Sequence, residues 1–152
     1  MELQLIDYEP RYQPYFEKFN KAWLEEYFTV EPFDKYVLEN PDEAIIKPGG
    51  KIYFAKAGET IIGTVGLRFI EPGVFELTKM AVDVNYSGGG AGKFLCQGGI
   101  DKAKDLGVKR LILFSNRQLE NAIHIYNKLG FIEIPVQPGT YERSDIMMEI
   151  IF

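Results

Sequence analysis

Residues 76–93 read ELTKMAVDVNYSGGGAGK. A run typical of a strand ends near Asp83, and a glycine-rich turn follows at 87–92 before a helical pattern begins. Glycine suits such a turn because it adopts positive φ and lets a ligand approach the backbone closely. Backbone N–H groups at a helix N-terminus attract anions, and a pyrophosphate fits such a site well. The stretch therefore predicts a strand–turn–helix unit with an anion site at the turn.

Two familiar phosphate-binding patterns do not fit this turn. A P-loop requires Gly-Lys-Ser/Thr after four intervening residues, but Phe94 follows Gly92-Lys93. A dinucleotide-binding turn follows a strand that opens a parallel unit, whereas the strand at 74–83 belongs to a hairpin. It also requires an acidic residue at a strand end about 20 residues later, and none is found there. The glycines alone are weak evidence for a specific ligand.

The sequence before the turn predicts an antiparallel meander. Three strand-like runs at 51–57, 60–69 and 74–83 are separated by short turn segments. A short strand at 3–6 opens the chain, and a helix begins at Pro10. That helix carries an aromatic stripe at three- and four-residue spacing, formed by Tyr15, Phe16, Phe19, Trp23, Tyr27 and Phe28. Most of the stripe is expected in the core, with a few members at a pocket mouth. Residues 31–50 predict a short helix at 35–39 followed by a loop.

After the turn, strands and helices alternate. Helices are predicted at 91–106 and 119–129, and strands at 109–115, 131–135 and 145–151. Gly98 and Gly99 within the first of these helices indicate either a close approach to the sheet or a local weakness. The predicted fold class is α/β (α+β): a mixed, mostly antiparallel central sheet of about seven strands flanked by about four helices. Residues 1–152 are expected to form a single domain.

Composition narrows the function classes. The net charge is −5 over 152 residues, which argues against nucleic acid and against a polybasic membrane contact. A mildly acidic surface weakly attracts cationic small molecules. Cys96 is the only cysteine, so neither an intrachain disulfide nor a cysteine zinc site is expected, and the aspartates are too dispersed to suggest a metal site. No signal region or long apolar run is evident, so a cytoplasmic location is the default expectation.

Two sequence blocks resemble one family. The turn at 87–92 resembles the signature Arg/Gln-x-x-Gly-x-Gly/Ala of the GNAT superfamily of N-acetyltransferases. A second block matches at Ala122, Tyr126, Lys128, Gly130 and Phe131. The closing stretch 142–149 looks like the end of a small-molecule branch of the family. The resemblance covers 51–152 well and 3–28 loosely, and it implies the GNAT-type fold.

The chain departs from the family pattern at two positions. Ser87 stands where the family has Arg or Gln, a long side chain that often contacts the pyrophosphate. Ser87 still offers a hydroxyl and an N–H, so the resemblance implies weaker binding at a surviving site. Leu119 stands where the family often has Asn, and Asn116 and Asn121 are the nearby candidates for that role.

The resemblance implies that acetyl-CoA is the co-substrate and that no metal is needed. Backbone N–H groups at the turn would hold the pyrophosphate, and Lys93 would add a charge. The backbone of Met80, Ala81 and Val82 would pair with the pantetheine arm as an added strand does. The N–H of Met80 or Ala81 would bind the developing oxyanion. The predicted cofactor-binding turn comprises Ser87, Gly88, Gly89, Gly90, Ala91, Gly92 and Lys93.

The implied reaction is the direct attack of a neutral amine on the thioester in a ternary complex. Glu76 is the predicted base, acting through a water, and its alternative reading is a solvated strand residue. Tyr126 is the predicted acid for the leaving thiolate, and its alternative reading is core packing. A Cys–His hydrolase based on Cys96 and His124 is disfavoured because the two residues lie on different helices.

The expected function is transfer of an acetyl group to the amine of a small molecule. Two alternatives stay open: a non-catalytic acyl-CoA-binding or sensor module, and a protein or peptide N-acetyltransferase. A closed aromatic pocket would disfavour the last of these. The predicted pocket aromatics are Tyr12, Tyr15, Trp23, Tyr27, Phe28 and Tyr141. The resemblance also implies a homodimer as one oligomeric state, since dimers are common among relatives.

Overall fold

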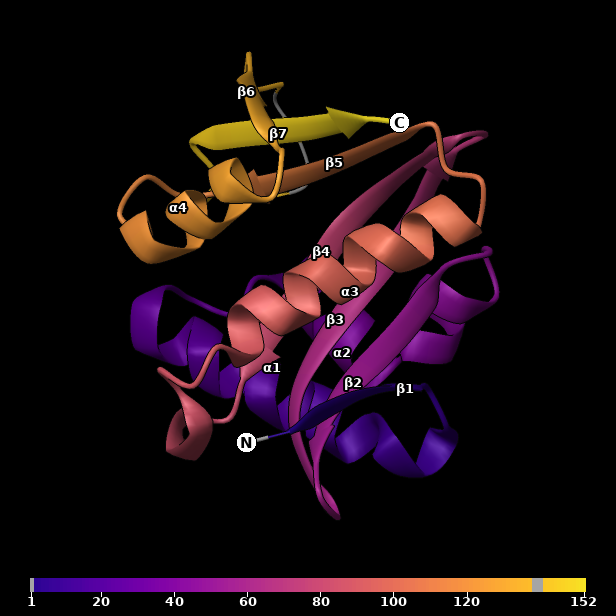
Figure 1. Ribbon diagram of the computed structural model, residues 1–152, viewed down its shortest axis with the longest axis vertical. Helices are drawn as coiled ribbons and strands as arrows, with labels where there is room; N and C mark the ends of the chain where they lie inside the picture. Colours follow the sequence, from indigo (N-terminus) through magenta and orange to yellow (C-terminus); the bar gives the residue numbers. More distant parts are fainter. Residues whose placement is uncertain (1, 138–140) are drawn as a thin grey trace.

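A single mixed sheet organises the chain in residues 2–137 and 141–152, which the computed structural model describes (Figure 1). The strand order is β1-β2-β3-β4-β5-β7-β6. The strands are β1 (Leu3–Asp7), β2 (Lys51–Ala57), β3 (Thr60–Glu71), β4 (Val74–Val82), β5 (Arg110–Ser115), β6 (Ile132–Ile134) and β7 (Ile146–Ile151). The helices are α1 (Gln13–Tyr27), α2 (Pro32–Glu39), α3 (Ala91–Asp105) and α4 (Glu120–Lys128). Short helical turns are η1 (Pro10–Tyr12), η2 (Asp42–Ile46) and η3 (Val84–Tyr86).

The two halves of the sheet are joined along only a short length of strand pairing. Strands β1 to β4 form an antiparallel meander, and β5, β7 and β6 form a second antiparallel group. Strands β4 and β5 are parallel and pair only from Val74–Arg110 to Glu76–Ile112. Beyond that point β4 continues to Val82 and β5 to Ser115 without pairing to each other. Figure 1 shows the two strands diverging, so the sheet opens between them.

Helices cover both faces of the sheet. Helix α3 packs on strands β1 to β4 from one side, while α1 packs on β3 and β4 and contacts α2. Figure 1 shows α3 in front of the meander and α1 and α2 behind it, with α4 beside β5. Each layer has its own core, one beneath α3 and one between the sheet and the α1–α2–η2 segment. This arrangement confirms the predicted mixed, mostly antiparallel α/β fold.

Two local features differ from the sequence predictions. The segment after the short helix, predicted as a loop, contains the π-helical turn η2, whose Ile45 is fully buried in the core. That apolar anchor outweighs the turn chemistry of the surrounding prolines. The short helix also begins at Pro32 rather than near residue 35, because Glu31 and Asp34 form a capping box at its N-terminus.

Gly98 and Gly99 of α3 lie where the helix packs closely against the sheet. A Cβ atom built on Gly99 would lie 2.6 Å from Leu77 Cδ1, and one on Gly98 would lie 2.9 Å from Leu5 Cδ2. On the facing strand, a Cβ on Gly63 would lie 2.7 Å from Leu95 Cδ1. Of the two readings of Gly98-Gly99, close packing against the sheet is therefore the one that applies.

We predict that Gly99→Ala destabilises the protein, although alanine is the better helix former. Overpacking costs about 1–3 kcal/mol, which exceeds the propensity gain of about 1 kcal/mol. Urea unfolding of both proteins measures the difference in free energy of unfolding. Gly92→Ala is the matched control, because its Cβ would meet only Ile125 Cδ1 at 3.9 Å. A Gly99→Ala protein as stable as the control would contradict close packing.

Candidate functional site

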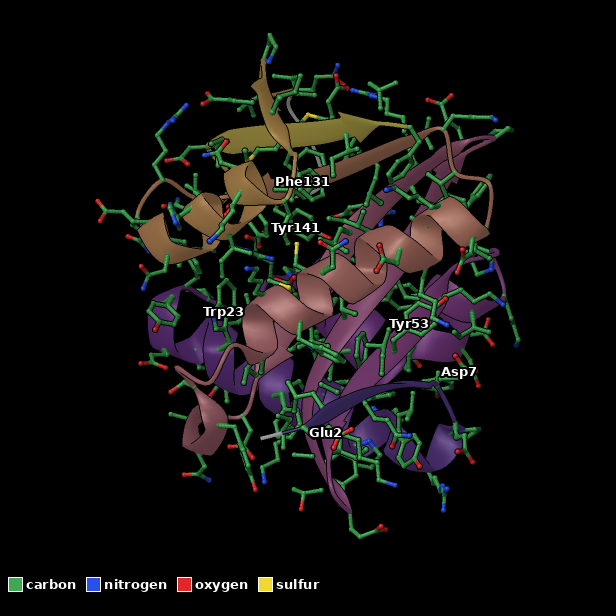
Figure 2. The ribbon with its side chains drawn as sticks, viewed as in Figure 1. Glu2, Asp7, Trp23, Tyr53, Phe131 and Tyr141 are labelled. Atoms are coloured by element: carbon green, nitrogen blue, oxygen red, sulfur yellow. The ribbon has the colours of Figure 1, made fainter. Side chains whose placement is uncertain are left out.

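The opening between β4 and β5 contains a cavity of about 80 Å³. Figure 2 shows Trp23 on the α1 side of this opening and Tyr141 nearer to β5 and β7. The walls therefore come from both halves of the sheet and from both helical layers. The lining residues are Asn20, Trp23, Leu24, Phe28, Glu76, Leu77, Thr78, Lys79, Met80, Leu113, Phe114, Ser115, Asn116, Leu119, Tyr126, Tyr141, Arg143 and Ser144.

The glycine-rich turn presents free backbone donors at the start of α3. The first hydrogen bond of the helix runs from the Phe94 N–H to the Gly90 carbonyl, at 3.0 Å. The backbone N–H groups of residues 88–93 have no acceptor within the described part of the chain. Gly88 and Gly90 have φ of 81° and 85°, the left-handed conformation that glycine adopts without strain. Together with the positive end of the helix dipole, these donors have the arrangement that attracts anions at helix N-termini. That an anion binds at this turn stays a prediction.

Ser87 directs its hydrogen-bond donors to a neighbouring backbone carbonyl. Its hydroxyl donates to the Val84 carbonyl at 3.0 Å, and its N–H points at the same carbonyl at 3.4 Å. Both donors that the sequence offered to an anion are thus directed away from it. Lys93 lies exposed in the first turn of α3.

A bulge interrupts β4 beside the cavity. The pairing with β3 steps from Gly66–Thr78 to Thr64–Ala81, so Lys79 and Met80 together face a single β3 residue, Val65. Lys79 has φ of +53°. Bulges re-aim backbone and side-chain groups, and here the bulge coincides with the edge that β5 leaves open. The predicted backbone donors at Met80 and Ala81 lie at this edge.

Glu76 is buried in the cavity wall with 1% of its surface exposed. Its Oε1 accepts a hydrogen bond from Arg68 Nε at 2.8 Å, and its Oε2 accepts one from the Tyr141 hydroxyl at 3.1 Å. The Tyr141 hydroxyl also lies 3.3 Å from Thr78 Oγ1. The alternative that Glu76 is a solvated strand residue is therefore wrong. The carboxylate is held in place at the last residue of β4 that pairs with β5.

Tyr126 reaches the same cavity from α4. Its ring packs against Phe131 with the centroids 5.9 Å apart, and its hydroxyl has no hydrogen-bond partner in residues 2–137 and 141–152. Burial, with a further contribution from Cys96, raises the pKa of the Tyr126 hydroxyl above its ordinary value. The hydroxyl is therefore protonated at neutral pH and available as a donor. Tyr126 therefore both packs its ring against Phe131 and lines the cavity.

A network of buried charges lies behind the bulge. Asp34 of α2 is fully buried, and its Oδ1 accepts a hydrogen bond from Lys79 Nζ at 2.7 Å. Arg143 donates two hydrogen bonds to the same carboxylate, at 2.7 and 3.0 Å, and a third to Glu31 at 3.1 Å. Burial alone would raise the pKa of the Asp34 carboxyl. The hydrogen bonds from Arg143 and the charge of Lys79 outweigh burial, so the pKa lies below its ordinary value.

The remaining predicted residues divide between the cavity and other sites. Asn116 lines the cavity, but its amide donates to the Arg143 carbonyl at 2.8 Å and accepts from the Gln118 N–H. Asn121 is exposed at the start of α4, outside the cavity lining. Of the predicted pocket aromatics, Trp23, Phe28 and Tyr141 line the cavity. Those outside its lining are Tyr12, Tyr15 and Tyr27.

Within the described residues, the structure places neither a reactive thiol nor a metal-binding cluster. Cys96 is buried, and burial raises the pKa of its thiol to about 12, while His124 is exposed on α4. A thiol in that state is a poor nucleophile. The described residues contain no group of three or more His, Cys, Asp or Glu side chains placed to hold a metal ion. Over the same residues, no helix has the length and apolar character needed to cross a membrane.

Comparisons with known proteins agree with this architecture. The family model of the acetyltransferase (GNAT) family matches residues 11–131. The uncharacterized N-acetyltransferase YvbK of Bacillus subtilis strain 168 is 29% identical over 104 residues, which is 66% of this chain and 67% of the relative.

Two crystal structures share the fold at low identity. A GNAT-family acetyltransferase from Staphylococcus aureus Mu50 matches 97% of this chain and 98% of its own, with 22% identity and a TM-score of 0.84. The PaiA N-acetyltransferase from Thermoplasma acidophilum, in complex with coenzyme A, matches 100% of both chains, with 18% identity and a TM-score of 0.75.

We predict that Asp34→Asn lowers the free energy of unfolding by about 3–5 kcal/mol at pH 7, because it leaves Lys79 and Arg143 buried without their shared counter-charge. The pKa of this carboxyl is depressed in the folded state from an ordinary value of 3.8. Its contribution is therefore present above pH 3.8 and is lost as the pH falls through the folded-state pKa. The difference in free energy of unfolding between the native protein and Asp34→Asn should therefore become smaller over that pH range.

Urea unfolding in a series of buffers from pH 7 to below pH 3.8 measures this gap. Glu43→Gln is the matched control, because Glu43 forms an exposed i,i+4 pair with Lys47. Such a pair contributes about 0–1 kcal/mol. A gap between native protein and Asp34→Asn that stays constant with pH would contradict the depressed pKa of Asp34.

Proposed function

Because the chain belongs to the acetyltransferase (GNAT) family, we propose that it transfers the acetyl group of acetyl-CoA to the amine of a small molecule. The observation that carries the proposal is the row of unpartnered backbone N–H groups at residues 88–93. This row lies at the N-terminus of α3, the helix that follows directly on β4 and its open edge. A ligand whose anionic group is bound there can place a flexible arm along β4 and into the cavity.

The chain offers separate contacts for each part of the co-substrate. The N–H groups of residues 88–93 would hold the pyrophosphate, and exposed Lys93 would add a charge-assisted contact. The open edge at Met80, Ala81 and Val82 would pair with the pantetheine amides. Ser87 contributes no donor while its hydroxyl and N–H stay directed at Val84. The acetyl thioester supplies the electrophilic carbonyl carbon.

Two residues would move the protons of the reaction. An alkylammonium acceptor with a pKa of about 10.4 must lose a proton before its nitrogen attacks. Glu76 would accept that proton through a water, with Arg68 and Tyr141 fixing its carboxylate. As the new C–N bond forms and the C–S bond breaks, the thiolate leaves. Tyr126 would give that thiolate its proton, which its raised pKa keeps in place until then. The attacking nitrogen would lose its second proton, which returns through solvent to the Tyr126 phenolate and leaves the neutral amide and free CoA.

The form of the cavity favours a small acceptor. On one side the cavity is lined by Trp23 of α1 and by Phe28, the residue that follows this helix. On the other side it is lined by Tyr141 and Arg143. The segment that carries the last two is tied to α2, since the Glu142 N–H donates to Glu31 Oε1 at 3.1 Å. About 80 Å³ of space behind aromatic walls suits a small amine better than an extended peptide. The protein or peptide acetyltransferase reading is accordingly the weaker one.

We predict that saturating acetyl-CoA raises the melting temperature. Ligand at 100 times its dissociation constant adds about 2.7 kcal/mol of stability. Ser87→Arg should enlarge the shift by restoring a cation at the anion site, and the matched Ser87→Glu should reduce it. Differential scanning fluorimetry with each protein measures all three shifts. The absence of a shift in the native protein and in Ser87→Arg would exclude acetyl-CoA as ligand.

We also predict that Glu76→Gln and Tyr126→Phe each lower kcat about 10²–10⁴-fold, the usual contribution of a proton-transfer residue. Release of free thiol from acetyl-CoA with a panel of small amines gives the rates. The dissociation constant for acetyl-CoA, from calorimetry, should stay unchanged in both variants. Binding without thiol release for any amine in the native protein would favour the non-catalytic acyl-CoA-binding module instead.

A further inference from the structure

Lys79 is the residue at which the backbone of β4 leaves the extended conformation. Its φ of +53° is the only positive value for a non-glycine residue in the described part of the chain. An L side chain is strained in this region, and such strain persists only where the surroundings hold it. Whatever holds Lys79 therefore also determines the form of the bulge at the cavity edge.

The side chain of Lys79 is held from the α2 side. Its Nζ donates to Asp34 Oδ1 at 2.7 Å and lies 4.7 Å from the centroid of the Tyr141 ring. Only 3% of the Lys79 side chain is exposed, so the ammonium has no solvent to replace this carboxylate. Asp34 is itself fixed by the two hydrogen bonds from Arg143. The end of the side chain is thus fixed in one position.

The carbonyl of Lys79 is held from the α1 side. It accepts a hydrogen bond from Thr64 Oγ1 at 2.8 Å. Thr64 Oγ1 accepts one in turn from Asn20 Nδ2 at 3.0 Å, and the same Asn20 amide donates to the Phe16 carbonyl at 2.9 Å. All of these groups are buried. The bulge is therefore clamped at its side chain and at its carbonyl by two independent sets of contacts.

We propose that Asp34 and Thr64 are positioning residues, which hold the Lys79 bulge so that the Met80 N–H meets the carbonyl oxygen of the bound acetyl group. This inference rests on the proposed function. When the amine attacks, the C=O π electrons move to that oxygen, and a fixed backbone donor stabilises the resulting charge. A bulge free to relax to an extended strand would carry the donor away from this position. Neither residue touches the substrate itself.

The test compares two substitutions of Lys79 by NMR of ¹⁵N-labelled protein titrated with CoA and with acetyl-CoA. In the native protein both ligands should move the amide signals of residues 88–93, and acetyl-CoA alone should move the Met80 amide further. Lys79→Met should lose that acetyl-specific response, since it removes the ion pair and keeps a side chain that disfavours positive φ. Lys79→Gly should keep the response, because glycine adopts positive φ without the ion pair.

Thr64→Val removes the contact to the Lys79 carbonyl while every charge stays in place, and it should also weaken the Met80 response. Lys79→Met leaves Asp34 paired with Arg143, so no buried carboxylate is orphaned in the main test. Loss of the Met80 response in Lys79→Gly as well as in Lys79→Met would show that the ammonium matters rather than the backbone conformation, and it would overturn the inference. If Lys79→Met keeps the acetyl-specific Met80 response, this inference is overturned while the proposed function stands.

Failure of the proposed function gives a different result. If neither CoA nor acetyl-CoA moves the signals of residues 88–93 in the native protein, the anion site does not bind the co-substrate. That outcome overturns the proposed function, and the inference falls with it. If the signals of residues 88–93 respond normally, only the Met80 response decides the role of Asp34 and Thr64.

Discussion

The cavity exists because β4 and β5 stop pairing after Glu76 and Ile112. A continuous ladder would bring these strands within about 4.7–4.9 Å of each other along their length and leave no room for a ligand. The bulge at Lys79 increases the local twist of β4, and it lies on the part of the strand that has left β5. Side chains from α1, α4 and the segment before β7 then reach the opening from three directions. One interruption of the sheet thus gathers residues from distant parts of the chain.

The charges beside this opening are arranged for geometry more than for stability. A buried ion pair often contributes no more than well-packed apolar residues of the same size, while the loss of one partner is strongly destabilising. The Asp34 cluster links α2, β4 and the segment before β7 through a single carboxylate. Apolar side chains in the same volume would pack without fixing the directions of these three segments. Directional hydrogen bonds to an ionised group supply that constraint.

The sequence predicted the sheet, the helices and the glycine-rich turn because each depends on local periodicity or on residues within one short stretch. It also identified Glu76 and Tyr126, which the fold brings to one cavity. It did not identify Asp34, Lys79 and Arg143, which look like ordinary surface charges. Lys79 lies 45 positions from Asp34 along the chain, and Arg143 lies 109 positions from it. The bulge was missed for a related reason, since only tertiary contacts hold a lysine at positive φ. Among the predicted aromatics, helical spacing alone could not separate Trp23, which lines the cavity, from Tyr27, which is exposed.

The row of free N–H groups at residues 88–93 belongs to the main chain, and this affects which substitutions the turn can accept. Every residue except proline carries the same N–H, so most side-chain replacements in the turn leave the donors in place. Replacements at Gly88 and Gly90, where φ is positive, are the ones that disturb the donors. Few side chains in the turn are therefore needed to keep these donors in place. A chain that is only 18% identical shares this fold with a TM-score of 0.75.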